Sequence, residues 1–272
     1  MKKQILLIAL LVLLSTGCTN QDNKIEVANE TQSTESNEST DKKIVFKDPK
    51  FEEAVRGIIK KETGDIYKSD VESITYFRAE NAGIKGLEDI HHFKNINALV
   101  LKNNEIDDIE AIAELTELTA IALSGNNISD ISPLANLTKI EVLALSENNI
   151  SDISALSKLA KITSLYLGDN EIKDISSLSN LYRMGVLHLN DNKITDLSAL
   201  SDSVNLMNLE LQNNEIEDIE SLSSVERLTI LKLNNNKITD VKELAGLKRL
   251  STLLLAGNPI TDLHLFQAIM IV

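Results

Sequence analysis

One spacing of apolar and polar residues dominates the chain from residue 99 to residue 263. Counting from Asn104, an asparagine recurs every 22 residues as far as Asn258. Apolar residues stand five and three positions before each asparagine and two and five positions after it, and an aspartate stands four positions after it. All 48 of these slots in the eight repeats are filled as the pattern requires. A period of this length indicates a solenoid of stacked repeats that share one core.

Each repeated position predicts a piece of structure. Apolar residues at alternate positions, as in Leu99 and Leu101, indicate a short strand, and stacked repeats would pair these strands in a parallel sheet. The asparagine side chain can bond backbone groups that are left unpaired where the chain leaves the strand. The aspartate can cap a short helical or 3₁₀ segment, because only about ten residues remain for the return path.

A helical cap is predicted ahead of the repeats, in residues 42–73. Asp48 and Pro49 suit the N-cap and the first position of a helix, and Gly64 is a candidate for its C-terminal stop. Apolar residues follow at helical spacing on one face: Phe51, Ala54, Val55, Ile58 and Ile59. Such a helix would cover the open apolar edge of the first repeat.

The repeat domain, assigned to residues 74–272, departs from the pattern in two places. A degenerate repeat precedes the regular eight, with Ala82 in the asparagine slot. Its other positions fit: Ile74, Phe77, Ala79, Ile84, Leu87 and Ile90. Further along, Ser203 interrupts an apolar column, and we expect Val204 to replace it through a one-residue slip.

These repeats resemble a known family. The segment LTAIALSGNNISDISPLANL, residues 118–137, is similar to the typical repeat of the internalins, the 22-residue bacterial class of leucine-rich-repeat proteins. Residues 44–90, with FKDPKFEEAVRGIIKKETGDI and ENAGIKGLEDI, resemble the N-terminal cap of such proteins. The resemblance, over about residues 44–266, implies an α/β repeat solenoid. In this leucine-rich-repeat horseshoe a parallel sheet lines the concave face, and short 3₁₀ or irregular segments form the convex face.

The N-terminus has the order of a secretory signal. The chain begins with the basic residues MKK, an apolar run covers residues 5–14, and the segment STGC ends at Cys18. The run is too short to be a permanent membrane span. Because STGC resembles the bacterial lipobox, we expect a signal peptide in residues 1–17 and acylation of Cys18, with palmitate as one acyl group. A plain secretory signal with an incidental cysteine is the alternative.

Residues 18–41 are expected to form a disordered tether, because they are rich in Ser, Thr, Asn and Glu without an apolar period. The lipid would hold the protein on the outer face of the cell membrane of a Gram-positive bacterium. The formal net charge of -14 argues against nucleic-acid partners. It also predicts repulsion from anionic headgroups, so that the lipid alone would hold the protein at the membrane.

No catalytic or metal site is predicted, and no cofactor is implied. The side chains of the adjacent His91 and His92 are expected to diverge, which disfavours a metal pair there. The repeated aspartates could suggest calcium, but capping explains them. No Ser/His/Asp or Cys/His constellation can be assembled, and Cys18 is the sole cysteine. An enzyme is therefore not expected.

What remains is the concave sheet face, on which the residues six and four positions before each asparagine should stand. This face is predicted to be exposed and to bind a partner through Val142, Tyr166, Val186, His188, Glu210, Ile230 and Lys232. A sheet face whose β-branched residues simply suit strands is the alternative.

The predicted function is that of a non-catalytic cell-surface lipoprotein that binds another macromolecule, foremost a protein. The internalin resemblance implies adhesion or host interaction. An envelope scaffold, or the binding subunit of a membrane complex, is the competing hypothesis. The apolar C-terminal residues 264–272 are expected to fold over the last repeat or to self-associate with a second copy, unless the chain is a truncated form.

Overall fold

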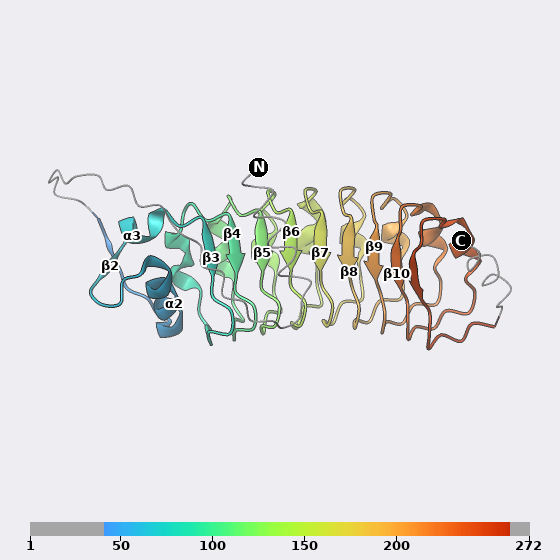
Figure 1. Cartoon of the computed structure of the whole chain (residues 1–272), viewed down its shortest axis with the longest axis horizontal. Coiled ribbons are helices and arrows are strands. Elements are labelled where there is room, and N and C mark those ends of the chain that lie inside the picture. The colour runs from blue at the N-terminus through green and yellow to red at the C-terminus, as the bar shows by residue number, and fades with distance from the viewer. Residues whose placement is uncertain (1–40, 262–272) are drawn as a thin grey trace.

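Each repeat contributes one short strand to a single parallel sheet. The computed structural model describes residues 41–261; Cys18, the predicted signal and tether, and the apolar C-terminal residues lie outside this range. Within it, nine strands pair in chain order with a constant offset of 22 residues, and they lie side by side along the molecule (Figure 1). The strands are β3 (Tyr76–Arg78), β4 (Ala98–Val100), β5 (Ala120–Ala122), β6 (Val142–Ala144), β7 (Ser164–Tyr166), β8 (Val186–His188), β9 (Asn208–Glu210), β10 (Ile230–Lys232) and β11 (Thr252–Leu254).

The convex side consists of short 3₁₀ helices, as the sequence predicted. They are η1 (Glu88–His92), η2 (Glu110–Glu114), η3 (Ser132–Leu134), η4 (Ser154–Lys158), η5 (Ser176–Leu178), η6 (Ser198–Leu200), η7 (Glu220–Ser224) and η8 (Lys242–Gly246). The core lies between these helices and the sheet, where columns of Leu and Ile such as Leu143 and Leu145 are fully buried. The predicted leucine-rich-repeat horseshoe is therefore confirmed.

The repeated asparagine joins neighbouring repeats through buried hydrogen bonds. At Asn148, Oδ1 accepts from the backbone N–H of Ile128 at 3.0 Å, and Nδ2 donates to the carbonyls of Leu123 and Leu145 at 3.1 and 3.0 Å. The same offsets recur at Asn104, Asn126, Asn170, Asn192, Asn214, Asn236 and Asn258. The predicted bonding of the asparagine amides to the turn backbone is therefore confirmed, and each amide also crosses to the preceding repeat.

The repeated aspartate caps the 3₁₀ helices. Oδ1 of Asp152 accepts from the backbone N–H of Ser154 at 2.8 Å, and Asp174 bonds Ser176 in the same way. The aspartate stands one residue before the N-cap, so the bond closes an Asx turn rather than a true N-cap. This role accounts for the acidic column without a metal ion.

A small cap closes the first repeat. Helix α2 (Pro49–Ile59) has Asp48 as its N-cap, and its Phe51 packs against Phe77 and Phe93 of the degenerate repeat, with ring centroids 5.3 and 5.8 Å apart. The strands β1 (Lys43–Ile44) and β2 (Ile66–Tyr67) form an antiparallel pair, followed by α3 (Lys68–Glu72). The predicted apolar helix face therefore lies on the solenoid core.

Asp48 also attaches the cap to the repeats. Its Oδ1 accepts from the N–H groups of Lys50 and Phe51, at 2.7 and 3.1 Å, and its Oδ2 from those of Lys85 and Gly86, at 2.6 and 2.8 Å. Burial opposes ionisation of this carboxyl, but these four backbone donors lower its pKa from the ordinary value of 3.8.

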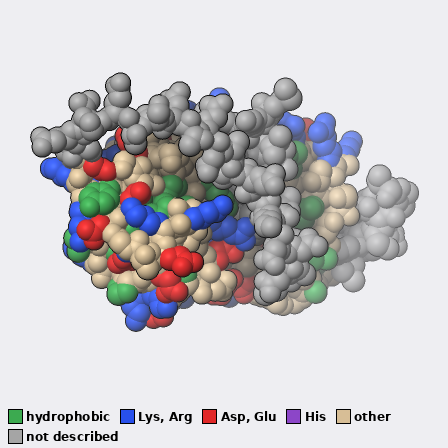
Figure 2. All heavy atoms as spheres, turned by 60° about the vertical axis from the view of Figure 1, so that its left-hand side comes forward, with side chains coloured by type: hydrophobic (Ala, Val, Ile, Leu, Met, Phe, Trp, Pro, Cys, Tyr) green, Lys and Arg blue, Asp and Glu red, His purple; other side chains and the backbone are tan. Residues whose placement is uncertain are grey.

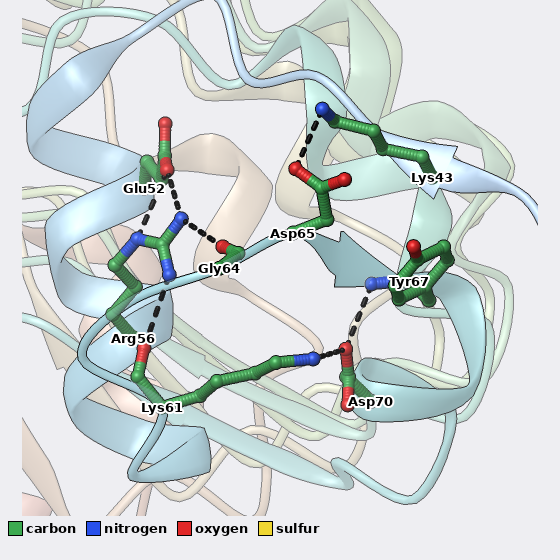
Figure 3. A network of polar contacts seen from close by, with 8 residues as sticks. All are labelled: Lys43, Glu52, Arg56, Lys61, Gly64, Asp65, Tyr67 and Asp70. Atoms are coloured by element: carbon green, nitrogen blue, oxygen red, sulfur yellow. Dashed lines mark hydrogen bonds and ion pairs between the residues drawn. The ribbon is translucent and has the colours of Figure 1, made fainter.

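The outer side of the cap is held by ion pairs (Figure 3). The Arg56 guanidinium bonds Glu52 at 2.6 Å and the carbonyls of Lys61 and Gly64 at 3.1 and 2.9 Å, while Lys61 pairs with Asp70 at 2.7 Å. Basic and acidic side chains are interspersed over this end of the molecule, with only small hydrophobic patches between them (Figure 2). The cap thus presents a polar surface to solvent.

Two details of the predicted fold were wrong. Helix α2 ends at Ile59, with Lys60 in the left-handed conformation at a φ of 56°, so Gly64 is not its C-terminal stop. The expected slip at Ser203 does not occur: Ser203 is buried in register, and Val204 is 51% exposed. The turn hydrogen bonds around Ser203 keep the spacing of the other repeats. The N–H of Ser203 donates to the carbonyl of Leu200, and the carbonyl of Ser203 accepts from the N–H of Leu206.

No helix among residues 41–261 is both long and apolar enough to cross a membrane.

Candidate binding surface

The first and third residues of each strand point away from the core, on the concave side of the solenoid. From β4 to β7 these positions form an apolar strip, which we define as Ala98, Val100, Ala120, Ala122, Val142, Ala144 and Tyr166, with Tyr76 and Val186 packed against it. From β8 to β10 the same positions are mostly polar or charged. The concave face therefore changes from apolar to polar along the molecule.

The predicted binding residues differ in their accessibility. Val142 is fully buried and Tyr166 is 8% exposed, and both belong to the apolar strip. The expectation that these two side chains stand open on the concave face was wrong. By contrast Val186, His188, Glu210, Ile230 and Lys232 are partly exposed. The accessible part of the predicted surface is therefore its polar half.

The parallel register brings four of the predicted residues into one row across the sheet. Tyr166, His188, Glu210 and Lys232 occupy the third position of β7 to β10 and are direct partners in the pairing. The rings of Tyr166 and His188 meet edge to face, with centroids 4.8 Å apart. One carboxylate oxygen of Glu210 lies 2.8 Å from Lys232 Nζ and 3.5 Å from His188 Nε2. We call these four residues the concave row.

The surroundings of His188 favour the neutral form of its imidazole. Burial lowers the pKa of its imidazole; Glu210 opposes this shift, and the nearby Lys232 adds to it. Asn208 Nδ2 lies 3.0 Å from His188 Nε2, which suits a ring nitrogen that accepts a hydrogen bond. The charged pair of Glu210 and Lys232 is thus flanked by a neutral aromatic cluster.

Two polar atoms beside the row lack partners. Asn208 Oδ1 and Gln212 Oε1 are buried and accept no hydrogen bond from the described part of the chain. An unsatisfied buried acceptor costs about 1–3 kcal/mol, which a donor from a ligand would recover. Asn208 was not among the predicted site residues. The sequence did hold a signal for it: Asn208 is polar, whereas the same position of the two neighbouring strands carries Val186 and Ile230.

The described residues hold no group of three His, Cys, Asp or Glu side chains placed to bind a metal ion. His91 and His92 do not diverge as predicted; in the 3₁₀ helix η1 their ring centroids lie 4.0 Å apart, with the ring planes tilted by 49°. His91 Nδ1 is engaged with the carbonyl of Glu88 at 2.6 Å. The pair is part of the convex surface, on the side opposite the concave row.

Comparisons with known proteins agree with this architecture. A family model of paired leucine-rich repeats matches residues 116–158 and 138–180, and a second leucine-rich-repeat model matches residues 204–260. An internalin C2 from Listeria monocytogenes is 33% identical, with a TM-score of 0.75, and the match covers 78% of this chain and 94% of that one. An internalin, InlF, from the same organism is 25% identical, with a TM-score of 0.63, over 82% and 80% of the two chains.

A more distant likeness is to a plant receptor. The leucine-rich-repeat ectodomain of the Arabidopsis thaliana membrane receptor kinase GASSHO1/SCHENGEN3 is 25% identical, with a TM-score of 0.58, over 64% of this chain and 23% of that one. That ectodomain was solved in complex with CASPARIAN STRIP INTEGRITY FACTOR 2. No curated protein sequence matches the chain significantly.

Proposed function

Because the chain belongs to the internalin family of leucine-rich-repeat proteins, we propose that it is a non-catalytic protein that binds another protein through the polar half of its concave face. The observation that carries this proposal is the concave row with its buried, unsatisfied neighbour Asn208 Oδ1. A partner could donate a hydrogen bond to Asn208 Oδ1, which the fold leaves unsatisfied, and could pack on the partly exposed Ile230.

The charges of the row favour a partner with matched charges of both signs. Lys232 and Glu210 neutralise each other, so the row carries no net charge although the whole chain has a formal charge of -14. Electrostatic complementarity at such a pair fixes the orientation of a partner more than it adds affinity. Aromatic and hydrogen-bonding contacts with Tyr166, His188 and Asn208 would then supply most of the binding free energy.

The location is a second part of the proposal. The lipobox-like segment that ends at Cys18 supports acylation of this cysteine, and a lipid there would hold the protein on the outer face of the membrane. The internalin relatives support adhesion or host interaction as the role. An envelope scaffold with no host partner is the alternative, since one fold serves many partners.

The binding proposal is tested by affinity capture with the full chain. We expect Ile230→Asp and Lys232→Glu to lower partner recovery at least about tenfold, because each changes a partly exposed side chain on the concave side of the polar half. Lys193→Glu is the matched control, since Lys193 lies on the exposed turn after β8 and pairs with Glu171. Unchanged recovery with both concave variants would exclude this face.

The location is tested separately on intact cells. If the protein acts in adhesion, external protease should remove the repeat domain, and Cys18→Ser should increase the share of the protein that is found in the medium. Full protection of the repeats from protease would favour the envelope scaffold instead.

A further inference from the structure

One long edge of the solenoid carries unusual charge. It comprises the segments that lead from the 3₁₀ helices η4 to η8 back to the next strand, residues 158–163, 180–185, 202–207, 224–229 and 246–251, and we call it the basic edge. It holds two acidic residues, Asp202 and Glu226, and six basic ones: Lys158, Lys161, Arg183, Arg227, Lys248 and Arg249. The opposite edge of the same repeats, residues 146–153, 168–175, 190–197, 212–219 and 234–241, holds eleven acidic and three basic residues. In these five repeats the negative charge is therefore concentrated on one side.

The cations of the basic edge are exposed and not neutralised. Arg227 bonds only the side-chain oxygen of Asn205, at 2.9 Å. The other five basic side chains make no ion pair with any residue that the structure describes. On the opposite edge, by contrast, Lys193 and Lys237 pair with Glu171 and Glu215 at 3.1 and 2.8 Å. The basic edge thus keeps its charge available for a partner.

Apolar side chains stand in the middle of this edge. Tyr182, Val204 and Met207 are 51%, 51% and 44% exposed, and Arg183 and Arg227 flank them. The Met207 methyl lies 3.5 Å from the place that a Cβ on Gly185 would take, so Met207 reaches back to the preceding repeat, which carries Tyr182. Half of the large hydrophobic residues that are exposed among residues 41–261 are in this patch: the others are Val45, Tyr67 and Leu254.

The repeat itself does not require apolar residues here. Thr119, Thr163 and Thr229 occupy the slot of Met207, and each donates its hydroxyl to a carbonyl of the preceding repeat, at 3.0 to 3.1 Å. Met207 forgoes that hydrogen bond. Val204 was available to fill the buried position of Ser203 but lies outside instead. The fold gains nothing from this exposure, which points to a contact with something else.

We propose that the basic edge docks on an anionic membrane surface. Arginine and lysine would contact headgroup phosphates, while Tyr182, Val204 and Met207 would enter the boundary between headgroups and acyl chains, where aromatic residues with a polar tip are favoured. The loops of successive repeats stand in a row along the molecule (Figure 1), which lets several of them rest on one flat surface.

The net charge does not prevent this contact. At physiological salt, charges are screened over about 8 Å. A membrane that touches the basic edge therefore interacts with that edge far more strongly than with the acidic edge across the solenoid. The repulsion predicted from the formal charge of -14 applies to a uniformly charged particle, which this protein is not. The docked orientation leaves the concave face open to the side.

The test measures binding of the full chain to vesicles. Cys18→Ser is included in every variant so that no acyl group contributes, and any binding by the N-terminal residues is common to all. Phosphatidylcholine vesicles are compared with vesicles that also contain phosphatidylglycerol. We expect the anionic vesicles to bind more protein, and R183E/R227E to lower that partition at least about tenfold, since each basic residue near the surface contributes roughly fivefold.

The matched control, K193E/K237E, makes the same change of charge on the opposite edge and should stay within about twofold of the parent. A third variant, Y182S/M207S, should weaken the binding that persists at high salt. The proposal is overturned if R183E/R227E binds like the parent, or if both double variants lose binding equally. It is also overturned if the edge variant keeps its vesicle binding but loses capture by polyglutamate, which would assign the edge to an acidic protein.

Discussion

At the scale of single residues, the repeated asparagine does more than its sequence position suggests. Its amide satisfies three backbone groups in two consecutive repeats, and all of them are buried. A hydrogen bond made in water-free surroundings contributes little net, but an unsatisfied buried group costs its full desolvation. Consecutive asparagines share these carbonyls, so the loss of one asparagine leaves one buried N–H unpaired and removes one of two donors from each carbonyl.

We expect Asn148→Ala to lower the free energy of unfolding by about 1–3 kcal/mol, since the buried N–H of Ile128 would lose its partner. The carbonyls of Leu123 and Leu145 would each lose one of two donors and keep the other, from Asn126 and Asn170. Chemical denaturation of both proteins measures the difference. The control is Asn149→Ala at the next position, which is exposed and should change stability by less than about 0.5 kcal/mol. Equal effects of the two substitutions would contradict this account.

Other residues could not be predicted because their surroundings come from distant parts of the chain. Asp48 was identified as a helix N-cap, but its second oxygen bonds Lys85 and Gly86, which no local pattern reveals. Likewise Asn208 became part of the candidate site only through its contact with His188 on the neighbouring strand. Local spacing predicts which atoms face one another along a repeat, but not which polar atoms remain unsatisfied.

At the scale of elements, the 22-residue spacing predicted strands, turns and 3₁₀ segments closely, because every repeat supports the same assignment. The failures occur where one repeat departs from the others. At Ser203 the pattern favoured a slip that would bury Val204, but the backbone hydrogen bonds of neighbouring repeats hold the register. The cost of breaking this ladder exceeds the gain from burying one more valine.

This register can be tested at the same two positions. Val204→Ser should change the free energy of unfolding by less than about 0.5 kcal/mol, because the side chain is half exposed. Ser203→Val should raise it by about 1 kcal/mol, since an apolar side chain would occupy a buried position of the Leu and Val column. Both values come from thermal or urea unfolding. A loss of more than about 2 kcal/mol in Val204→Ser would instead support the slipped register.

At the scale of the whole molecule, each repeat contacts only its neighbours, so the ends of the stack limit its stability. The N-terminal end depends on the cap, where Phe51 covers Phe77 and Phe93. Asp48 connects the cap helix to the first turn of the solenoid. A change of protonation at this one carboxyl should therefore act on the entire end.

The direction of this pH effect follows from the lowered pKa of Asp48. Its ionised form is favoured in the folded state, so the stabilisation is complete above the ordinary value of 3.8 and is lost as the pH falls below it toward the folded pKa. At pH 7, Asp48→Ala should lower the free energy of unfolding by about 1–2 kcal/mol, as expected for a lost helix cap. The difference between wild type and Asp48→Ala should shrink as the pH is lowered through this range.

Hydrogen exchange locates the effect within the molecule. Because coupling runs between neighbouring repeats, Asp48→Ala should raise exchange in α2 and β3 before it does so in β9 and β10. Glu53→Ala is the control: Glu53 lies on the same helix and forms only an exposed pair with Lys50, so its removal should leave exchange unchanged. If β9 and β10 lost protection together with α2, the solenoid would behave as one cooperative unit, and the cap would have no separate role in protecting its end.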